Sequence, residues 1–168
     1  MSTHRPDEVD RLVGAWSRER PDLDTAPMEV LSRVTRLARH LDLARRTAFE
    51  AHDLETWEFD VLTALRRSGA PYQLSPGQLL RETMVTSGTM TNRVDRLATK
   101  GLVARLPDPD DKRGVLVQLT RKGRRRVDAA LEGLLEQERR LLDGLTLRQR
   151  SSLANLLRTV VAPFDDDA

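Results

Sequence analysis

The segment from Ser75 to Thr120 restricts the possible fold of this chain more than any other part of it. It begins with Ser-Pro-Gly-Gln, which places serine at a helix N-cap, proline at the first helical position and glutamine at the third. This capping box predicts a short helix that ends near Thr83. A second helix is predicted from about Ser87 to Lys100, and Gly101 ends it because glycine readily adopts the left-handed conformation that closes a helix.

Two short runs with β character follow the second helix. Residues 102–106 and 115–119 flank Pro-Asp-Pro-Asp-Asp-Lys-Arg-Gly, a loop rich in turn formers. The second run has the two-residue period of a strand, with Val115, Val117 and Leu119 on one side. The order of short helix, turn, helix and β-hairpin is that of a winged helix-turn-helix.

Further helices are predicted on both sides of this segment. One begins after Pro6, and the others cover about Met28–Ala51, Thr56–Arg67, Thr120–Asp143 and Thr146 onward. The last two begin at threonines that suit the N-cap position. The predicted fold class is therefore mainly α with a small β-hairpin wing, a winged helix-turn-helix set between long helices.

Composition excludes several classes of protein. No apolar run approaches the roughly 20 residues that a membrane span needs, and the N-terminus lacks the apolar core of a signal peptide. The chain has no cysteine, which removes disulfides, thiolate catalysis and cysteine-based zinc sites. The histidines, His4, His40 and His52, have no metal-ligand spacing, and no phosphate-binding glycine loop or nucleophile motif is present. We therefore expect a cytoplasmic protein, not an enzyme, with no catalytic or metal-binding residues, no cofactor and no membrane partner.

The charge of the chain is unevenly distributed. Between Arg81 and Arg126 there are twelve basic and five acidic residues, whereas acidic residues outnumber basic ones in the remainder. A basic middle region between acidic flanks is what attraction to phosphates requires. The charge distribution favours double-stranded DNA as a partner, although a solvated basic face would look the same.

The second helix of the motif has two distinct sides. Met90, Val94 and Leu97 fall together on one side at 100° per residue and would anchor the helix. The polar residues Asn92 and Arg96 gather on another side, and they suit adenine and guanine edges in the major groove. The open N–H groups at the start of the helix can face a phosphate.

The loop between the two strands is predicted to reach the minor groove or its phosphates through Arg113, with Asp111 orienting that arginine by a charge-assisted hydrogen bond. The complete set of residues predicted to contact DNA consists of Ser75, Thr86, Ser87, Thr89, Thr91, Asn92, Arg96, Asp111, Lys112 and Arg113.

The residues from Trp57 to Gly123 carry a family resemblance. EFDVLTALRRSG, LSPGQLL, TSGTMTNRVDRLATKGLV and PDPDDKRGVLVQLTRKG together resemble the MarR family of bacterial transcriptional regulators. The resemblance implies a homodimer joined through helical regions 1–54 and 121–168, with residues 55–120 as the DNA-binding region. It also implies a pseudo-palindromic operator, with recognition helices in successive major grooves about 34–36 Å apart. Repression is the default that the resemblance implies.

The N-terminal extension around Trp16 is similar to that of the urate-responsive subfamily. The resemblance implies a ligand site at Trp16, Asp60, Arg93 and Arg105, and an anionic purine-like effector such as urate or xanthine. Arg93 lies at the border between the apolar stripe and the groove face, from which it could reach Asp60. Our hypothesis is that the ligand competes for the pairing of Arg93 with Asp60, shifts the recognition helix and weakens DNA binding.

Three other interpretations stay open at this point. The effector could be a phenolic or drug-like compound, or the protein could have no effector, with Trp16 packing and the charges forming surface ion pairs. A winged helix can also serve as a protein-interaction module, which would call for an apolar exposed recognition face.

Overall fold

The computed structural model describes residues 5–83, 86–111 and 114–165 of the chain. The chain forms two compact units, Met1–Arg45 and Arg46–Ala168. The N-terminal unit holds helix α1 (Glu8–Glu19) and most of helix α2 (Ala26–Glu50), whose last turn belongs to the second unit.

Helix α1 begins at a capping box and is tied to α2 by ion pairs. Asp7 accepts hydrogen bonds from the backbone of Val9 at 2.8 Å and of Asp10 at 3.0 Å. Arg33 of α2 lies 2.9 Å from Asp7 and 2.6 Å from Asp10. The pKa of Asp7 is lowered to about 2, first by the backbone hydrogen bond from Asp10 and then by the side-chain hydrogen bond from Arg33.

Acid is therefore expected to loosen helix α1. The pKa of Asp7 is lower in the folded chain than its ordinary value of 3.8, so its stabilising contribution is present above that value and is lost as the pH falls toward about 2. Circular dichroism across this range should show a loss of helix that is smaller in Asp7→Asn than in the wild type. Identical acid titrations of the two proteins would contradict this account of the cap.

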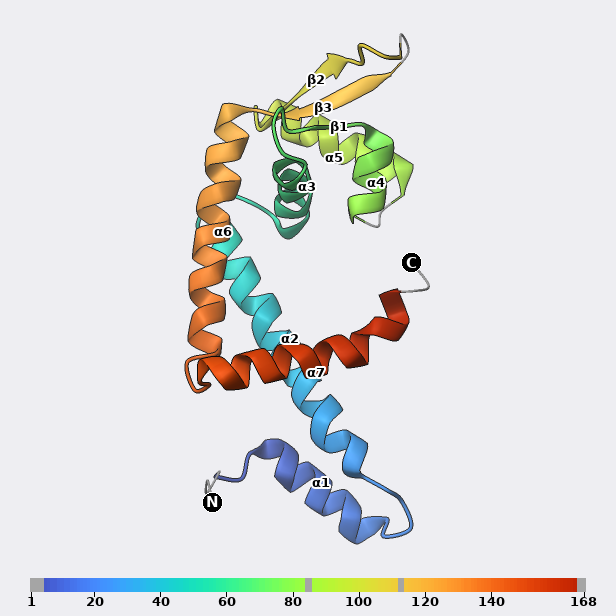
Figure 1. Ribbon diagram of the computed structural model, residues 1–168, viewed down its shortest axis with the longest axis vertical. Helices are drawn as coiled ribbons and strands as arrows, with labels where there is room; N and C mark the ends of the chain where they lie inside the picture. Colours follow the sequence, from blue (N-terminus) through green and yellow to red (C-terminus); the bar gives the residue numbers. More distant parts are fainter. Residues whose placement is uncertain (1–4, 84–85, 112–113, 166–168) are drawn as a thin grey trace. The chain divides into compact units, whose positions relative to one another are not determined.

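The second unit contains the predicted short helix, turn, helix and hairpin. The elements of this unit are α3 (Thr56–Arg67), β1 (Gln73–Leu74), α4 (Pro76–Thr83), α5 (Ser87–Thr99), β2 (Val103–Pro107), β3 (Val115–Leu119), α6 (Arg121–Leu141) and α7 (Leu147–Asp165). Figure 1 shows α3, α4 and α5 grouped beside the hairpin of β2 and β3, with α6 running along α3. The predicted fold class, mainly α with a small β wing, is confirmed.

The core of the second unit fixes the position of α5. Phe49 at the end of α2 stacks on Phe59 of α3, with ring centroids 4.0 Å apart. Full burial of such a side chain contributes about 1.5–3 kcal/mol relative to exposure. The other fully buried side chains are almost all aliphatic and include Leu62, Leu65, Leu79, Met90, Leu97, Leu102, Val117 and Val127.

The sheet has three antiparallel strands in the order β1-β3-β2, whereas the sequence predicted only the β2–β3 hairpin. Val117 of the central strand β3 lies opposite Arg105 of β2 and Leu74 of β1. Strand β1 is only two residues long, so it has no periodicity of its own. It forms because its backbone can pair with the donors and acceptors along the edge of β3.

The junction between α5 and β2 differs by one residue from the prediction. Leu102 was expected to begin the strand, but its backbone N–H donates to the carbonyl of Leu97 at 2.9 Å and so closes the helix. Gly101 has a φ of 70°, the left-handed conformation that a helix end of this kind requires.

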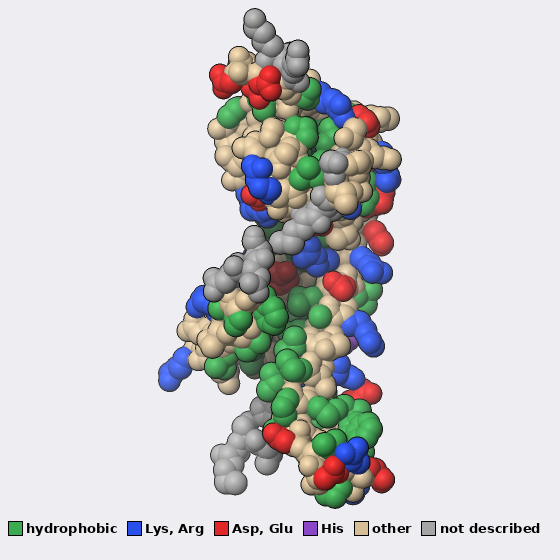
Figure 2. Space-filling model, turned by 90° about the vertical axis from the view of Figure 1, so that its right-hand side faces the viewer, with side chains coloured by type: hydrophobic (Ala, Val, Ile, Leu, Met, Phe, Trp, Pro, Cys, Tyr) green, Lys and Arg blue, Asp and Glu red, His purple; other side chains and the backbone are tan. Residues whose placement is uncertain are grey.

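Many large hydrophobic side chains of the helices outside the winged segment are exposed, and Figure 2 shows hydrophobic side chains gathered on the surface of the molecule. In the N-terminal unit they are Leu12, Trp16, Val30, Leu31, Val34, Leu37 and Leu43, and Leu23 between the two helices is exposed as well. On α7 they are Leu147, Leu156, Leu157, Val160, Val161 and Phe164. None of the described helices is both long and apolar enough to cross a membrane.

Candidate nucleic-acid interface

Helix α4 begins at the predicted capping box. The Ser75 hydroxyl accepts a hydrogen bond from the backbone of Gln78 at 3.2 Å, and the Gln78 side chain accepts one from the backbone of Ser75 at 2.7 Å. Helix α5 follows with Thr86 at its N-cap in extended backbone. The hydroxyls of Thr86 and Thr89 lie 2.9 Å apart at this helix start.

Helix α5 has the two sides that the sequence predicted. Met90, Val94 and Leu97 are buried, with 2% or less of each residue exposed, and they hold the helix against the core. Thr89, Thr91, Asn92 and Arg96 are exposed. The helix can therefore present hydroxyl, amide and guanidinium groups to a partner without disturbing its packing. The side chain of Ser87 lies outside the described part of the structure.

The guanidinium of Arg96 is held by two residues from the start of α3. Its Nη2 donates to Oε1 of Glu55 at 2.6 Å, and its Cζ lies 4.7 Å from the centroid of the Trp57 ring. The indole N–H of Trp57 donates to Oε2 of the same Glu55 carboxylate at 2.7 Å. The hydrogen bond from Trp57 is the main cause of a lowered pKa of Glu55, followed by the charge of Arg96. We call Glu55 and Trp57 the Arg96 clasp.

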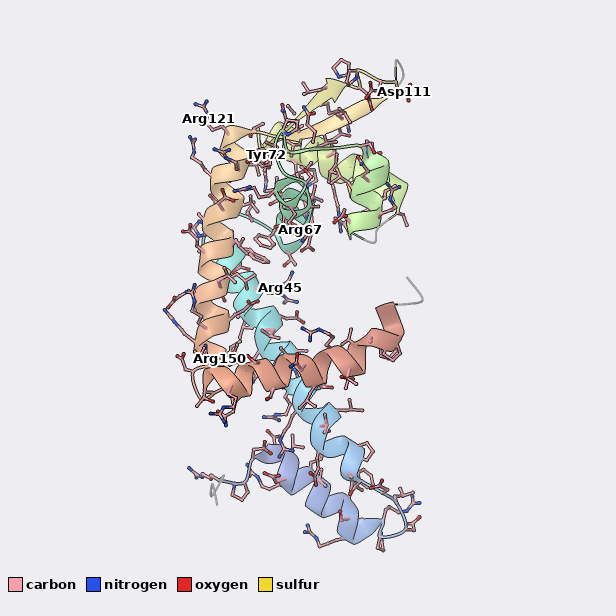
Figure 3. All side chains as sticks on the ribbon, viewed as in Figure 1. Arg45, Arg67, Tyr72, Asp111, Arg121 and Arg150 are labelled. Atoms are coloured by element: carbon pink, nitrogen blue, oxygen red, sulfur yellow. The ribbon has the colours of Figure 1, made fainter. Side chains whose placement is uncertain are left out.

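The hairpin ends in a loop that is partly described. The Asp108 backbone N–H donates to the carbonyl of Gly114 at 3.0 Å, and the Gly114 N–H donates to the carbonyl of Asp111 at 2.8 Å. Figure 3 places Asp111 at the far end of the hairpin. Lys112 and Arg113 lie outside the described residues, so their contact with DNA and the orientation of Arg113 by Asp111 remain predictions.

The base of the hairpin is joined to α6 and α3 around one aromatic ring. Arg66 of α3 and Arg124 of α6 lie with their Cζ atoms 5.1 and 5.6 Å from the centroid of the Tyr72 ring. Arg66 also pairs with Asp128 of α6 at 2.8 Å. These contacts connect the sheet to the helix that follows it, and the labels of Tyr72 and Arg121 in Figure 3 mark the region.

Two of the predicted ligand residues lie in one pocket. Asp60 of α3 and Arg93 of α5 both border a hollow with a volume of about 540 Å³, and both are half-buried. The Arg93 Cζ lies 5.4 Å from the centroid of the Trp57 ring. The lining of the hollow is Arg46, Glu50, Leu54, Glu55, Thr56, Trp57, Asp60 and Arg93.

Of the other two predicted ligand residues, one belongs to the same unit as this hollow and the other does not. Arg105 of β2 pairs with Asp95 of α5 at 2.7 Å and does not border the hollow of Asp60 and Arg93. Trp16 belongs to the N-terminal unit, where 47% of the residue is exposed. Among the described residues, no group of three or more histidine or acidic side chains could hold a metal ion.

The clasp and the rest of the pocket lining were not predicted from the sequence. Glu55 and Arg96 are separated by 41 positions, and no local period connects them. The available signal was the pattern Glu55-x-Trp57-Glu58 at the start of the predicted helix, a pattern that by itself indicates only capping.

Comparisons with known proteins decide the family. A family model described as MarR family matches residues 52–114. The HTH-type transcriptional regulator PecS of Dickeya dadantii is 38% identical over 153 residues, which cover 91% of this chain and 92% of PecS. The chain belongs to the MarR family.

This MarR family protein shares its fold with solved winged-helix regulators. A mutant MarR from E. coli complexed with operator DNA matches it with a TM-score of 0.67 and 28% identity, over 82% of this chain and 96% of that one. Bordetella bronchiseptica BpsR, whose DNA binding is regulated by 6-hydroxynicotinic acid, matches with a TM-score of 0.62 and 28% identity, over 78% and 91%. The protein is thus a DNA-binding transcriptional regulator whose relatives are regulators and not enzymes.

Proposed function

We propose that this MarR family protein binds a pseudo-palindromic operator as a homodimer, acts as a repressor, and is released by a small purine-like effector such as urate or xanthine. The observation that carries the DNA-binding part is the arrangement of α5, which buries its apolar side and exposes Thr89, Asn92 and Arg96. Polar groups on an anchored helix of this kind can read base edges in the major groove. They also argue against a protein-interaction module, which would need an apolar exposed face.

Exposed hydrophobic side chains on α1, α2 and α7 support the homodimer. Solvent-exposed apolar surface of this extent is typical of surfaces that associate. We assign dimerisation to residues 1–54 and 121–168 and DNA binding to residues 55–120. In such a dimer, the predicted contacts from Ser75, the start of α5 and the wing would repeat on the second half-site.

The chemistry of the Asp60–Arg93 pocket supports a purine-like effector. Its lining combines two arginines with three carboxylates, and it includes the Trp57 ring. A purine such as urate has N–H donors that suit a carboxylate, acidic oxygens that suit an arginine, and a flat face that suits an indole. A phenolic acid offers the acidic edge and the flat face but not the ring N–H donors. We include Arg105 and Trp16 in the proposed site as the subfamily resemblance implies.

A mobility-shift titration tests the effector. The DNA upstream of the protein's own gene should be released by urate or xanthine and not by salicylate. Arg93→Ala and Asp60→Ala should each require a higher effector concentration for release. Release by salicylate alone would replace the purine with a phenolic effector, and unchanged release from both variants would show that the pocket is not the site.

The proposed contact of α5 with DNA bases gives a separate prediction. Asn92→Ala should weaken operator binding about tenfold, since one good contact between a side chain and a base contributes about 1–3 kcal/mol. Thr99→Ala is a matched control on the same helix, because its hydroxyl donates to the carbonyl of Asp95 at 3.0 Å and is bound within the helix. Fluorescence anisotropy of labelled operator DNA measures both affinities. Equal affinities of the two variants for the operator would show that Asn92 contacts no base.

A further inference from the structure

Trp57 lies between two hollows of the second unit. One is the pocket of Asp60 and Arg93, and the other, with a volume of about 550 Å³, is bordered by Thr89, Asn92 and Arg96 on the exposed side of α5. Trp57, together with Glu55 and Arg93, borders both hollows. The indole is thus part of the candidate effector pocket and of the candidate DNA-reading surface at once.

The contacts of Trp57 connect these two surfaces chemically. Arg93 and Arg96 approach its ring with Cζ to centroid distances of 5.4 and 4.7 Å. Each distance is within the range of a cation–π contact. The Glu55 carboxylate receives the indole N–H on one oxygen and Arg96 on the other, at 2.7 and 2.6 Å. The ring therefore cannot turn without losing a hydrogen bond to the carboxylate that also holds Arg96.

We propose that Trp57 is the aromatic surface on which a planar heterocyclic effector stacks, and that Glu55 transmits occupancy of the pocket to Arg96. The inference rests on the proposed function, because it assigns a binding residue and a switch to the proposed effector pocket. A flat ligand on the indole competes with the guanidinium of Arg93 for the ring face. Movement of the indole then disturbs the Arg96 clasp, and Arg96 leaves the position in which it meets DNA.

The contacts of Arg96 at the clasp can change easily. The ion pair of Arg96 with Glu55 is on a half-exposed part of the surface, where water can replace a lost partner at low cost. A small rotation of Trp57 is therefore enough to change which groups Arg96 contacts. Only a ligand that prefers the rotated state shifts the equilibrium away from DNA binding.

The test uses the full-length protein, urate and xanthine as probes, and two measurements on each variant. The first is the dissociation constant of the probe, and the second is the probe concentration that releases half of a labelled operator DNA. Trp57→Leu keeps an apolar side chain but removes the ring, so probe binding should weaken about tenfold. The chain contains two tryptophans, and the probe should quench the tryptophan fluorescence of the wild-type protein more strongly than that of Trp57→Leu.

Glu55→Gln tests whether occupancy of the pocket is transmitted to Arg96, separately from how tightly the probe binds. For this variant the ratio of the half-release concentration to the probe's dissociation constant should rise at least about tenfold. Glu136→Gln is the control, because Glu136 is an exposed, ion-paired glutamate of α6 remote in sequence from the clasp. This control should behave as the wild type in both measurements.

The outcomes separate the inference from the proposed function. If a purine releases the wild-type protein but Trp57→Leu binds the probe with wild-type affinity, the inference is wrong and the proposed function stands. A normal release ratio in Glu55→Gln would refute the transmission to Arg96. If neither purine binds the wild-type protein, the purine effector fails, and the role of Trp57 fails with it.

Discussion

Gly123→Ala is expected to lower the free energy of unfolding by about 3 kcal/mol, the upper part of the range for overpacking a well-packed site. Gly123 is buried in the first turn of α6. A Cβ atom there would lie 2.1 Å from the carbonyl oxygen of Leu102 and 2.9 Å from Cδ1 of Leu119. The first of these is a backbone atom, so it cannot be relieved by a change of rotamer.

The backbone around Gly123 is held in place by a network of hydrogen bonds. The Leu102 carbonyl accepts from the backbone of Thr120 at 3.1 Å and from its hydroxyl at 3.0 Å. The same hydroxyl accepts from the N–H of Gly123 at 3.0 Å and so caps α6. Moving the helix away from Leu102 would break this cap, which by itself contributes about 1 kcal/mol.

Gly133→Ala in the same helix is the matched control. A Cβ at this position would meet only His52 at 3.8 Å and Ala48 at 4.0 Å, which are ordinary contacts. This variant should be unchanged or more stable by up to about 1 kcal/mol, because alanine favours the helix over glycine. Urea denaturation followed by circular dichroism compares the three proteins. If both variants unfolded at the same urea concentration, α6 would not pack on Leu102 as described.

Lys100→Met is expected to lower the free energy of unfolding by about 3 kcal/mol, because it leaves a buried carboxylate without its cation. Glu58 is fully buried, and its carboxylate lies 2.6 Å from the Lys100 ammonium. The same carboxylate accepts a hydrogen bond from the backbone of Glu55 at 3.0 Å. The ion pair thus fastens the end of recognition helix α5 to the start of α3. We take the lower end of the range for broken buried pairs because the Lys100 side chain is 39% exposed.

A double variant distinguishes the loss of the cation from the loss of side-chain packing. Glu58→Gln/Lys100→Met removes both charges, so it should recover much of the stability that Lys100→Met loses. Lys122→Met is the matched control, since Lys122 donates to the backbone carbonyl of Lys100 at 2.8 Å from an exposed position. Lys122→Met should lower the free energy of unfolding by less than about 1 kcal/mol. A loss in Lys100→Met no larger than in Lys122→Met would contradict the role of the buried pair.

Local features of this fold could be read from the sequence, whereas pairings between distant segments could not. The bounds of α3 and β3 and the caps at Ser75 and Thr120 agree with the prediction, because each depends on residues within one turn or one strand. The anchoring side of α5 was predicted for the same reason. Strand β1 was missed because two residues become a strand only through their pairing with β3.

In the candidate site, too, local features could be predicted from the sequence and pairings between distant segments could not. The exposed position of Asn92 follows from helical periodicity, and so does the half-buried position of Arg93 between core and surface. The attachment of Arg96 to Glu55 and Trp57 depends on how α3 packs beside α5, which no local pattern in the sequence records. Arg105 was expected in the ligand site from family resemblance, and the side chain that it meets, Asp95, is ten positions away on another element.

If the exposed side of α5 binds DNA as part of a basic surface, the affinity of the protein for DNA must depend on the salt concentration. The most direct test is a titration of the wild-type protein against the DNA upstream of its own gene, at about 50 mM and about 200 mM salt. We expect binding at low salt that weakens about a thousandfold at the higher concentration, because several phosphate contacts release counterions. Binding to unrelated DNA should be much weaker at both concentrations. Absence of binding at low salt, or an affinity that does not depend on salt, would contradict DNA binding by this surface.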